Sequence, residues 1–213
     1  MSGRTKQKRR QMRIYFDGCS WTKGEELENQ EEERYSRLIC NKLGAEETNL
    51  GIGGGSNDRI IRNLIVENNI EEYDHAVIQM TLPARTEYWN NASGGGKWIK
   101  INPCFNFSNW LFQKEGRIDN LSNKFRHHSN FWTYYYKMIF NVYYSHVKEK
   151  IQYETIKSYC KSKGVPLTIC SINEWSKLDF DYLMKMKRRH RAKMGHPNKL
   201  GHQIIAKSIL DKI

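Results

Sequence analysis

The sequence predicts an α/β fold of three layers (α/β/α), in which helices cover both faces of a doubly wound, mostly parallel sheet. Segments typical of strands alternate with segments of helical apolar spacing, in the order strand, helix, strand, helix, strand, long excursion, strand, helix. The third strand segment, Tyr73 to Met80, has Ala-Val-Ile at its middle, which is typical of a strand buried on both faces. Small or polar residues follow the first three strand segments. Their place matters, because open α/β sheets bind ligands at the carboxyl ends of their strands.

The predicted strands cover residues 12 to 17, 46 to 52, 73 to 80 and 165 to 170. The predicted helices cover residues 35 to 43, 60 to 65, 130 to 163 (one long helix or a pair) and 204 to 213. We expect the first helix to end at Gly44, because glycine adopts the left-handed conformation of a helix C-terminus at little cost. Ser56 or Asn57 is the expected N-cap of the second helix, since both side chains accept hydrogen bonds from backbone N–H groups.

The composition favours one domain inside a reducing compartment. A chain of 213 residues is long enough for one sizeable core, and no apolar run approaches the ~20 residues that a membrane span needs. The first residues, Met-Ser-Gly-Arg-Thr-Lys, lack the apolar segment of a signal peptide. The cysteines are odd in number, scattered and without a Cys-x-x-Cys pair, as expected of reduced thiols: Cys19, Cys40, Cys104, Cys160 and Cys170. We therefore expect a cytoplasmic protein.

The formal net charge of +12 is concentrated in two clusters. One cluster lies near the N-terminus and consists of Arg4, Lys6, Lys8, Arg9, Arg10 and Arg13; the other consists of Lys185, Lys187, Arg188, Arg189, Arg191 and Lys193. Such clusters bind phosphate backbones by counterion release, and the same field attracts anionic glycans or lipid surfaces. The alternative is a solvated tail and a solubilising face without a partner.

The chain divides into a basic arm and one domain. Residues 1 to 11 are expected to be a disordered arm, and residues 12 to 213 a single domain. A long loop at about 88 to 129 interrupts this domain and is rich in Asn, Gly and aromatic residues, including Trp89, Trp98 and Trp110. Because long loops in compact domains are often lids or binding loops, we expect substrate specificity here. A structural insertion without such a role is the alternative.

The segment Tyr15-Phe-Asp-Gly-Cys-Ser-Trp-Thr-Lys-Gly24 indicates where chemistry takes place. A short apolar strand leads into small residues, which places Ser20, with the thiol of Cys19 beside it, where a nucleophile is useful. The glycine-rich turn from Gly51 to Gly55 lacks the Gly-Lys-Ser/Thr ending of a phosphate-binding loop. Its glycines instead allow backbone N–H groups to approach a ligand oxygen, as in an oxyanion hole.

Four separated blocks resemble the SGNH (GDSL-like) hydrolase family, in the divergent form met in phages and large viruses. They are Gly18-Cys-Ser20, the glycine turn around Gly54, the segment Thr81-Leu-Pro-Ala-Arg-Thr-Glu87, and His196-Pro-Asn. The resemblance implies the flavodoxin-like fold of that family and a viral or phage origin, with the host cytoplasm or the virion as location. It also implies Ser20 as nucleophile, His196 as general base, and oxyanion donors at Ser20, Gly54 and Thr81.

The sequence departs from the family pattern at three positions that matter. The Asn of the third block, the usual third oxyanion donor, has no counterpart, and Thr81 is the nearest candidate, although its hydroxyl is a poorer substitute. Cys19 replaces the usual Asp before the serine, while Asp17 stands two places further back. Lys193 replaces the acid three residues before the histidine, and a lysine there disfavours the imidazolium that forms during reaction. Three alternatives follow. A backbone carbonyl holds His196 in a Ser-His dyad; a carboxylate of Asp179, Asp181 or Glu174 completes a triad; or the site is inactive and only binds.

The remaining candidates have smaller roles. Arg85 and Glu87 either bind substrate or form a structural ion pair. His202 is expected to be structural, and the pair His127-His128 has no further ligands at zinc-like spacing, so no metal or other cofactor is expected. The sequence thus predicts a serine hydrolase of carboxylesters or carbohydrate O-acetyl esters that works through an acyl-enzyme. The rival prediction is a weakly active or inactive protein that binds nucleic acid or anionic glycan through its basic clusters.

Overall fold

The computed structural model describes residues 10 to 91, 96 to 101, 131 and 134 to 213. Its strands are β1 Arg13–Asp17, β2 Glu46–Asn49, β3 His75–Met80, β4 Thr86–Asn90, β5 Lys97–Ile101, β6 Leu167–Ser171 and β7 Tyr182–Leu183. Its α-helices are α1 Ser20–Lys23, α2 Gln30–Glu33, α3 Tyr35–Leu43, α4 Asn57–Arg62, α7 Val142–Ser162 and α8 Lys199–Leu210. Shorter 3-10 or π-helical turns cover Asn63–Glu67, Ile70–Glu72, Tyr135–Ile139 and Arg188–His190.

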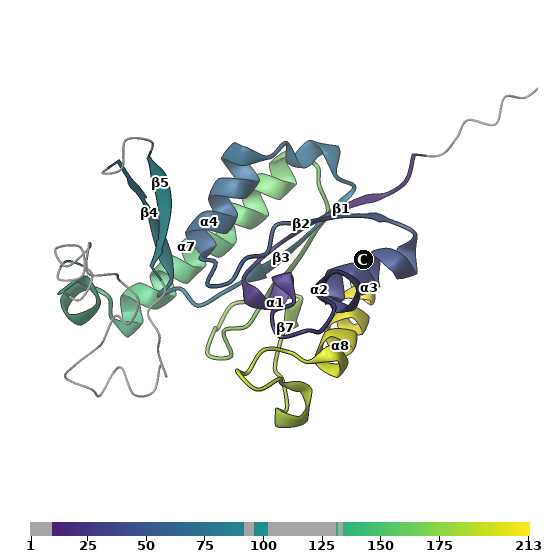
Figure 1. Ribbon diagram of the computed structural model, residues 1–213. Coiled ribbons are helices and arrows are strands. Elements are labelled where there is room, and N and C mark those ends of the chain that lie inside the picture. The colour runs from purple at the N-terminus through teal and green to yellow at the C-terminus, as the bar shows by residue number, and fades with distance from the viewer. Residues whose placement is uncertain (1–9, 92–95, 102–130, 132–133) are drawn as a thin grey trace, which may run out of the picture.

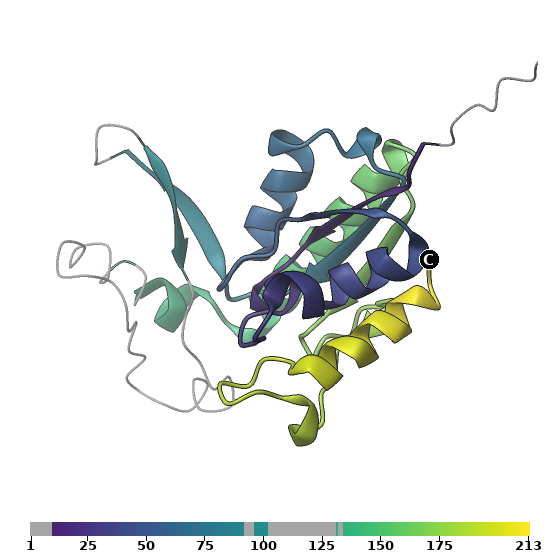
Figure 2. The same cartoon turned by 45° about the vertical axis from the view of Figure 1, so that its right-hand side comes forward.

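The central sheet is parallel, with the strand order β2-β1-β3-β6-β7 in the described part of the chain. Helices α3 and α8 cover one face of this sheet, and α4 and α7 cover the other (Figure 1). Figure 2 shows α3 and α8 side by side, with the loop before α8 close to α1. This arrangement confirms the predicted three-layer class. It brings the carboxyl ends of β1, β3 and β6 to one rim.

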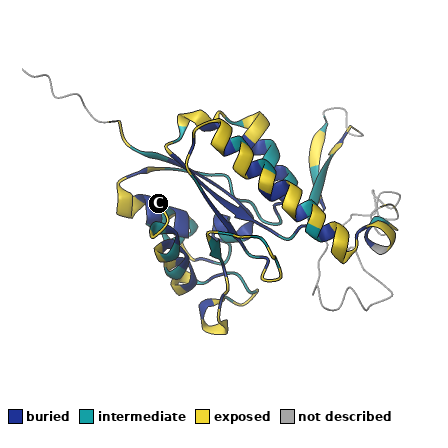
Figure 3. Cartoon of the chain, turned by 180° about the vertical axis from the view of Figure 1, so that it is seen from behind, coloured by how far each residue is buried: buried dark blue, intermediate teal, exposed yellow. Residues whose placement is uncertain are grey.

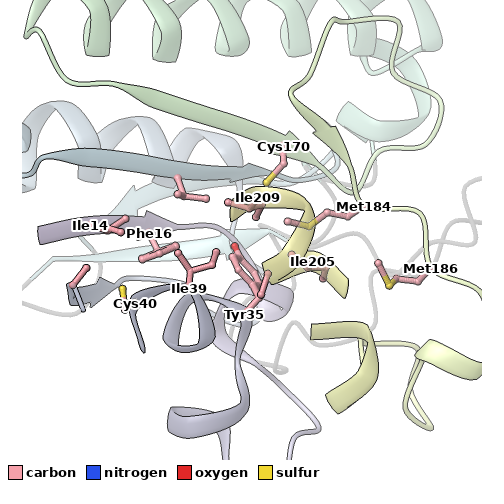
Figure 4. Packing of buried hydrophobic residues seen from close by; sticks show 13 residues of the cluster. Ile14, Phe16, Tyr35, Ile39, Cys40, Cys170, Met184, Met186, Ile205 and Ile209 are labelled. Carbon is pink, nitrogen blue, oxygen red and sulfur yellow. The ribbon is translucent and has the colours of Figure 1, made fainter. Parts of the chain in front are cut away.

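Strands β1, β3 and β6 consist almost entirely of buried residues, which are dark blue in Figure 3. In β1, Ile14 and Phe16 pack toward α3 and α8, whereas Tyr15 packs toward α4 and α7. Figure 4 shows the first of these clusters, in which Tyr35 of α3 and Ile205 of α8 meet the sheet. Each fully buried side chain of this size contributes about 2 kcal/mol by leaving water. The alternation therefore fixes the register of β1 and, with it, the direction of the loop that follows.

The expected helix ends are confirmed. Gly44 ends α3 in the left-handed conformation with φ +65°, and its N–H donates to the carbonyl of Cys40. Ser56 is the N-cap of α4, because its side chain accepts a hydrogen bond from the N–H of Arg59. The long segment expected as one helix or a pair is a π-helical turn followed by the 21-residue α7, whose N-cap is Asn141.

The segment expected as a long loop contains an antiparallel hairpin, which sequence reasoning missed. Strands β4 and β5 pair from Thr86 with Ile101 to Asn90 with Lys97, and one face of the hairpin packs on Tyr136 and Phe140. Residues 102 to 130, with Trp110 and His127-His128, lie outside the described residues. The two-residue strand β7 was also missed, since no strand was predicted after residue 170.

The described end of the basic arm is held by ion pairs. Arg10 lies 3.0 Å from the carboxylate of Asp74, and Arg13 pairs with Glu72 and Glu46. Residues 1 to 9 lie outside the described residues. No helix in the described part of the chain combines the length and apolar character that a membrane crossing requires.

Candidate active site

Ser20 lies directly after β1, where it begins the short helix α1. Gly18 makes the tight turn possible, because a Cβ there would lie 2.1 Å from Oγ1 of Thr22 and 2.8 Å from Oε1 of Gln79. Ser20 is 5% exposed, and Cys19 is fully buried. The serine is thus at the rim of the sheet in a position fixed by close packing.

A buried polar network holds the loop that carries Ser20. The Oε1 atom of Gln79 on β3 accepts hydrogen bonds from the N–H of Cys19 at 3.1 Å, from its thiol at 3.2 Å and from the hydroxyl of Thr22 at 3.1 Å. Thr22 also lies 2.8 Å from the hydroxyl of Tyr35. Buried polar groups are costly unless they are paired, so these bonds specify one loop conformation. The thiol of Cys19 is committed to Gln79 rather than turned toward solvent.

The buried carboxylate of Asp17 also holds the loop that carries Ser20. Its carboxylate is fully buried and accepts hydrogen bonds from the N–H of Gly18 at 2.7 Å, from Nη1 of Arg59 at 2.8 Å and from Nδ2 of Asn63 at 2.9 Å. Arg59 also donates to the carbonyl of Leu50, which precedes the glycine turn. Asp17 is therefore a structural anchor between β1, α4 and the glycine turn.

The glycine turn packs directly onto the serine loop. A Cβ on Gly55 would lie 2.9 Å from the carbonyl oxygen of Gly18, and one on Gly51 would lie 2.6 Å from the backbone nitrogen of Lys23. Gly54 adopts the left-handed conformation with φ +67°. Among the described residues, no acceptor lies within hydrogen-bonding reach of the Gly54 N–H. Gly54 thus lies in a turn that packs on the loop of Ser20.

Thr81 follows β3 at the same rim and is fully buried. Its N–H donates to Oδ1 of Asn57 at 2.8 Å, and its hydroxyl accepts a hydrogen bond from Nη1 of Arg85 at 2.6 Å. The backbone N–H and the hydroxyl oxygen of Thr81 are thus both engaged within the protein.

The carboxylate of Glu26 contacts the imidazole of His196. The side chain of Glu26 accepts a hydrogen bond from Nδ1 of His196 at 2.8 Å, and others from the N–H of Met194 at 2.7 Å and of His196 at 3.2 Å. Partial desolvation tends to raise the pKa of Glu26, but these bonds outweigh it, so the pKa lies below its ordinary value. Glu26 is thereby kept ionised beside the ring.

The backbone of Glu26 is strained. Its φ of +70° is the one positive value among the described non-glycine residues. A left-handed conformation costs an ordinary residue about 1–2 kcal/mol, and such strain often occurs at functional sites. Sequence reasoning missed Glu26, since nothing local in the acidic run after Ser20 distinguishes it. Its chemistry depends on His196, which is 170 positions away in the chain.

The other ring nitrogen of His196 faces a second carboxylate. Nε2 lies 3.7 Å from the side chain of Glu25, which also pairs with Lys23 at 3.3 Å. The carboxylate of Glu25 lies against Gly53, where a Cβ would be 2.2 Å from its Oε1 atom. Glu25 thus lies between the histidine and the glycine turn.

His196 contacts the loop that follows Ser20 in the chain, but the Ser20 hydroxyl and the His196 imidazole make no hydrogen bond to each other. In the described part of the chain, the hydroxyl of Ser20 bonds to Sγ of Cys19 at 3.8 Å. The imidazole is bound by Glu25 and Glu26, which follow Ser20 by five and six residues. Catalytic hydrogen bonds are often long in ligand-free enzymes, so this geometry is compatible with a site that closes on substrate.

The predicted acids are engaged elsewhere. The carboxylate of Asp181 accepts a hydrogen bond from the N–H of Ile169 at 2.7 Å, and the carbonyl of Asp179 accepts one from the hydroxyl of Tyr153. Both aspartates line a pocket between α7 and β6, with a volume of about 570 Å³. Glu174 lies 3.6 Å from Arg191. Among the described residues, the carboxylates within 4 Å of the imidazole belong to Glu25 and Glu26.

Arg85 and Glu87, predicted to bind substrate or each other, have distinct partners. Glu87 accepts two hydrogen bonds from Arg62 of α4, at 2.7 and 3.2 Å, which ties the hairpin to the domain. Arg85 donates to Thr81 as described above. The geometry of Glu87 is thus that of a structural ion pair.

His202 is buried, as expected for a structural residue. Its Nδ1 accepts a hydrogen bond from the N–H of Tyr35 at 3.1 Å, and burial lowers its pKa to about 4. Within the described ranges, no group of three or more His, Cys, Asp or Glu side chains is arranged to hold a metal ion. The four described cysteines are free and buried.

No protein-family model matches this sequence, and a comparison with curated proteins finds no match. Solved structures do resemble it. A family two carbohydrate esterase from Clostridium thermocellum in complex with cellohexaose is 13% identical, with a TM-score of 0.51 over 95% of this chain and 63% of that one. A two-domain esterase active on acetylated mannans is 16% identical, with a TM-score of 0.48 over 94% of this chain and 48% of that one.

A putative lipolytic protein of the G-D-S-L family from Desulfitobacterium hafniense DCB-2 is 11% identical, with a TM-score of 0.45 over 95% of this chain and 99% of that one. Identities this low establish a fold and leave activity open. The TM-score of 0.51 to the carbohydrate esterase from Clostridium thermocellum covers 95% of this chain and thus includes its parallel sheet. The chain therefore has a three-layer α/β/α fold similar to that of the carbohydrate esterase.

Proposed function

We propose that the chain is a serine ester hydrolase of the SGNH family, acting on carboxylesters or carbohydrate O-acetyl esters. The observation that carries this proposal is the 2.8 Å hydrogen bond between Nδ1 of His196 and Glu26, on the loop that continues from Ser20. A carboxylate in this place fixes the tautomer of the ring and stabilises the imidazolium. Ser20, His196 and Glu26 then act as nucleophile, base and orienting acid.

The reaction follows from these roles. Oγ of Ser20 attacks the carbonyl carbon of the ester while Nε2 of His196 takes the serine proton. The tetrahedral oxyanion is bound by the N–H groups of Ser20 and Gly54, with the hydroxyl of Thr81 as a third donor. His196 gives its proton to the leaving alcohol, and the acyl-serine remains. Water then attacks the acyl carbon while His196 takes a proton from it. The bond between the acyl carbon and Oγ breaks, His196 gives the proton to Oγ, and the carboxylic acid leaves.

Before this reaction can occur, Nε2 of His196 must exchange Glu25 for Ser20 as its partner. Nε2 faces Glu25 at 3.7 Å in the structure, so Glu25 has to withdraw before the ring can reach Ser20. Lys23, 3.3 Å from the same carboxylate, offers the withdrawn Glu25 an ion pair. An ester that enters between the glycine turn and His196 would displace this carboxylate, so that substrate binding and assembly of the site coincide.

The proposal also includes the viral type of the family, the carbohydrate substrate and the cytoplasmic location. The phage or large-virus type is supported by the Gly-Cys-Ser-Trp-Thr-Lys-Gly and Thr-Leu-Pro-Ala-Arg-Thr-Glu blocks alone. A carbohydrate ester as substrate is supported by the likeness in fold to a carbohydrate esterase, of whose length this chain covers 63%. The cytoplasm as location remains a prediction from the sequence.

Turnover of para-nitrophenyl acetate tests the proposal. Ser20→Ala and His196→Ala should each lower kcat at least about 1000-fold, because the nucleophile and its base act as one unit. Ser162→Ala, which removes an exposed hydroxyl at the end of α7, is the matched control and should leave kcat unchanged. A fluorophosphonate should add its mass to the peptide that contains Ser20. Equal turnover in all four proteins would exclude the hydrolase.

A further inference from the structure

One exposed cationic segment lies beside the candidate site and has no part in the reaction above. We name it the basic loop, and its members are Lys185, Lys187, Arg188, Arg189, Arg191 and Lys193, all exposed. We infer that the basic loop binds the acidic groups of a polysaccharide, so that the substrate is an O-acetylated polyanionic glycan. This inference rests on the proposed ester hydrolase and specifies its substrate class.

The basic loop and His196 belong to one tight turn. Arg191 forms an antiparallel bridge with Pro197, and the N–H of Ala192 donates to the carbonyl of His196 at 2.7 Å. Bridged residues have Cα atoms about 5 Å apart, which is less than the screening length of about 8 Å at physiological ionic strength. The field of the nearer cations therefore reaches the place where the ester would bind.

The charge of the basic loop is largely unbalanced. Arg191 lies 3.6 Å from Glu174, and no other carboxylate in the described part of the chain lies within 4 Å of the loop's cations. Elsewhere, arginines are neutralised at short range, as Arg34 is by Glu47 at 2.9 Å. Six cations against one acid leave a positive surface, which attracts polyanions and raises their rate of association.

The basic loop is also held in place. Nε of Arg191 donates to the carbonyl of Met186 at 3.1 Å, and Nδ2 of Asn198 donates to the carbonyl of Arg189 at 2.9 Å. The side chains of Met186 and His190 are buried and alternate with the exposed cations. Binding a polyanion would thus order long side chains but little backbone, which limits the entropic cost.

The opposite flank of the site favours a sugar polymer as the anion. Trp89 and Trp98 of the β4–β5 hairpin are 50% and 42% exposed and pack edge to face, with ring centroids 5.5 Å apart. Lys100 of the same hairpin donates to the carbonyl of Gly53 at 2.8 Å, which places the hairpin against the glycine turn. Figures 1 and 2 place this hairpin and the basic loop on different sides of α1. Arg62 covers one face of Trp98 at 4.5 Å, so a glycan across α1 would meet the exposed parts of the two indoles at one end and cations at the other.

A comparison of an anionic with a neutral acetylated polysaccharide separates the effect of charge from that of sugar binding. Wild-type protein should hydrolyse acetylated polygalacturonate, which is anionic, with a KM that rises several-fold between 50 and 300 mM NaCl, whereas the KM for neutral acetylated mannan should not change. Lys185→Gln/Lys187→Gln/Arg188→Gln should raise the KM for the anionic polymer about tenfold, as expected for three screened surface charges. Turnover of para-nitrophenyl acetate should stay the same.

A second triple variant controls for total charge. Lys42→Gln/Lys207→Gln/Lys212→Gln removes three exposed cations from other surfaces and should leave every KM unchanged. An equal KM shift in both triple variants, or an equal KM for both polymers, would overturn the inference. So would tighter binding of a 12-nucleotide single-stranded DNA than of polygalacturonate at 150 mM NaCl, since the basic loop would then be a nucleic-acid site.

Direct binding separates this inference from the proposed reaction. Unacetylated polygalacturonate carries no ester, so calorimetry can measure its affinity for wild-type protein and for both triple variants. Loss of binding in the first variant alone supports the basic loop even if no ester is hydrolysed. Hydrolysis of para-nitrophenyl acetate without any binding of polygalacturonate would sink the inference and leave the hydrolase standing.

Discussion

The two halves of the candidate site are held in opposite ways. The serine half is fixed by buried groups: Asp17, fully buried, pairs with Arg59, and Gln79 binds the loop that carries Ser20. The histidine half is fixed by two partly exposed carboxylates, Glu25 and Glu26, with side chains 29% and 18% exposed. Buried pairs fix geometry, whereas pairs in contact with water exchange partners at small cost. The comparison indicates that the nucleophile is stationary and that the histidine side adjusts.

The largest expected effect comes from breaking the buried anchor. Asp17→Ala leaves the guanidinium of Arg59 buried without its anion, and we expect a loss of about 3–5 kcal/mol in the free energy of unfolding. Urea denaturation measures this loss. Glu67→Ala is the matched control: it removes a carboxylate that is 50% exposed and pairs with Arg62, so it should cost less than about 1 kcal/mol. Similar losses in the two variants would contradict a rigid serine half.

The second test breaks the histidine half without unfolding the protein. Glu26→Gln keeps one acceptor oxygen, which can serve the N–H of Met194, and replaces the oxygen that faces the N–H and Nδ1 of His196 by an uncharged NH2 group. The kcat for para-nitrophenyl acetate should fall about 100-fold or more, because the ring loses its orienting anion. The melting temperature should change little.

A rescue variant distinguishes orientation from a general structural role. Lys193→Asp places a carboxylate three residues before His196, where the sequence resemblance implies an acid. Added to Glu26→Gln, it should recover part of the lost kcat. Full activity of Glu26→Gln alone would leave a Ser-His dyad as the better account of the site.

The third expected effect is that the free energy of unfolding depends on pH through the buried His202. Burial lowers the pKa of His202 to about 4, against about 6.5 in the unfolded chain, so the unfolded state binds more protons between these values. The contribution of His202 is thus fully present above pH 6.5 and is lost as the pH falls toward 4. Lowering the pH from 7 to 4.5 should therefore reduce the contribution of His202 to the free energy of unfolding by about 2 kcal/mol.

Urea denaturation at pH 7 and pH 4.5 checks this contribution. His202→Asn offers an oxygen to the N–H of Tyr35 but does not titrate, so its stability should fall less than that of the wild type over this range. Parallel losses in both proteins would show that His202 is not the group responsible.

The difference between the serine half and the histidine half also explains which parts of the site the sequence predicted and which it did not. The alternation of Ile14, Tyr15 and Phe16 is local, so β1 and the place of Ser20 follow from periodicity. The partner of His196 does not, because Glu26 is 170 positions away and gains its role only where the loops meet. The β4–β5 hairpin was missed because its strands are five residues each and lie in a segment rich in loop-forming residues.

The smallest expected effect concerns the acids that the sequence proposed as the third member. Asp179 and Asp181 lie in the pocket between α7 and β6, where Asp181 caps the N–H of Ile169. Asp179→Asn and Asp181→Asn keep the oxygen acceptors and should leave kcat within about twofold of wild type, since neither carboxylate lies within 4 Å of the imidazole. Assayed beside Glu26→Gln, the two variants identify which carboxylate the histidine uses. A fall of 100-fold in either would move the orienting acid to β6 and make Glu26 only an anchor for the turn around Met194.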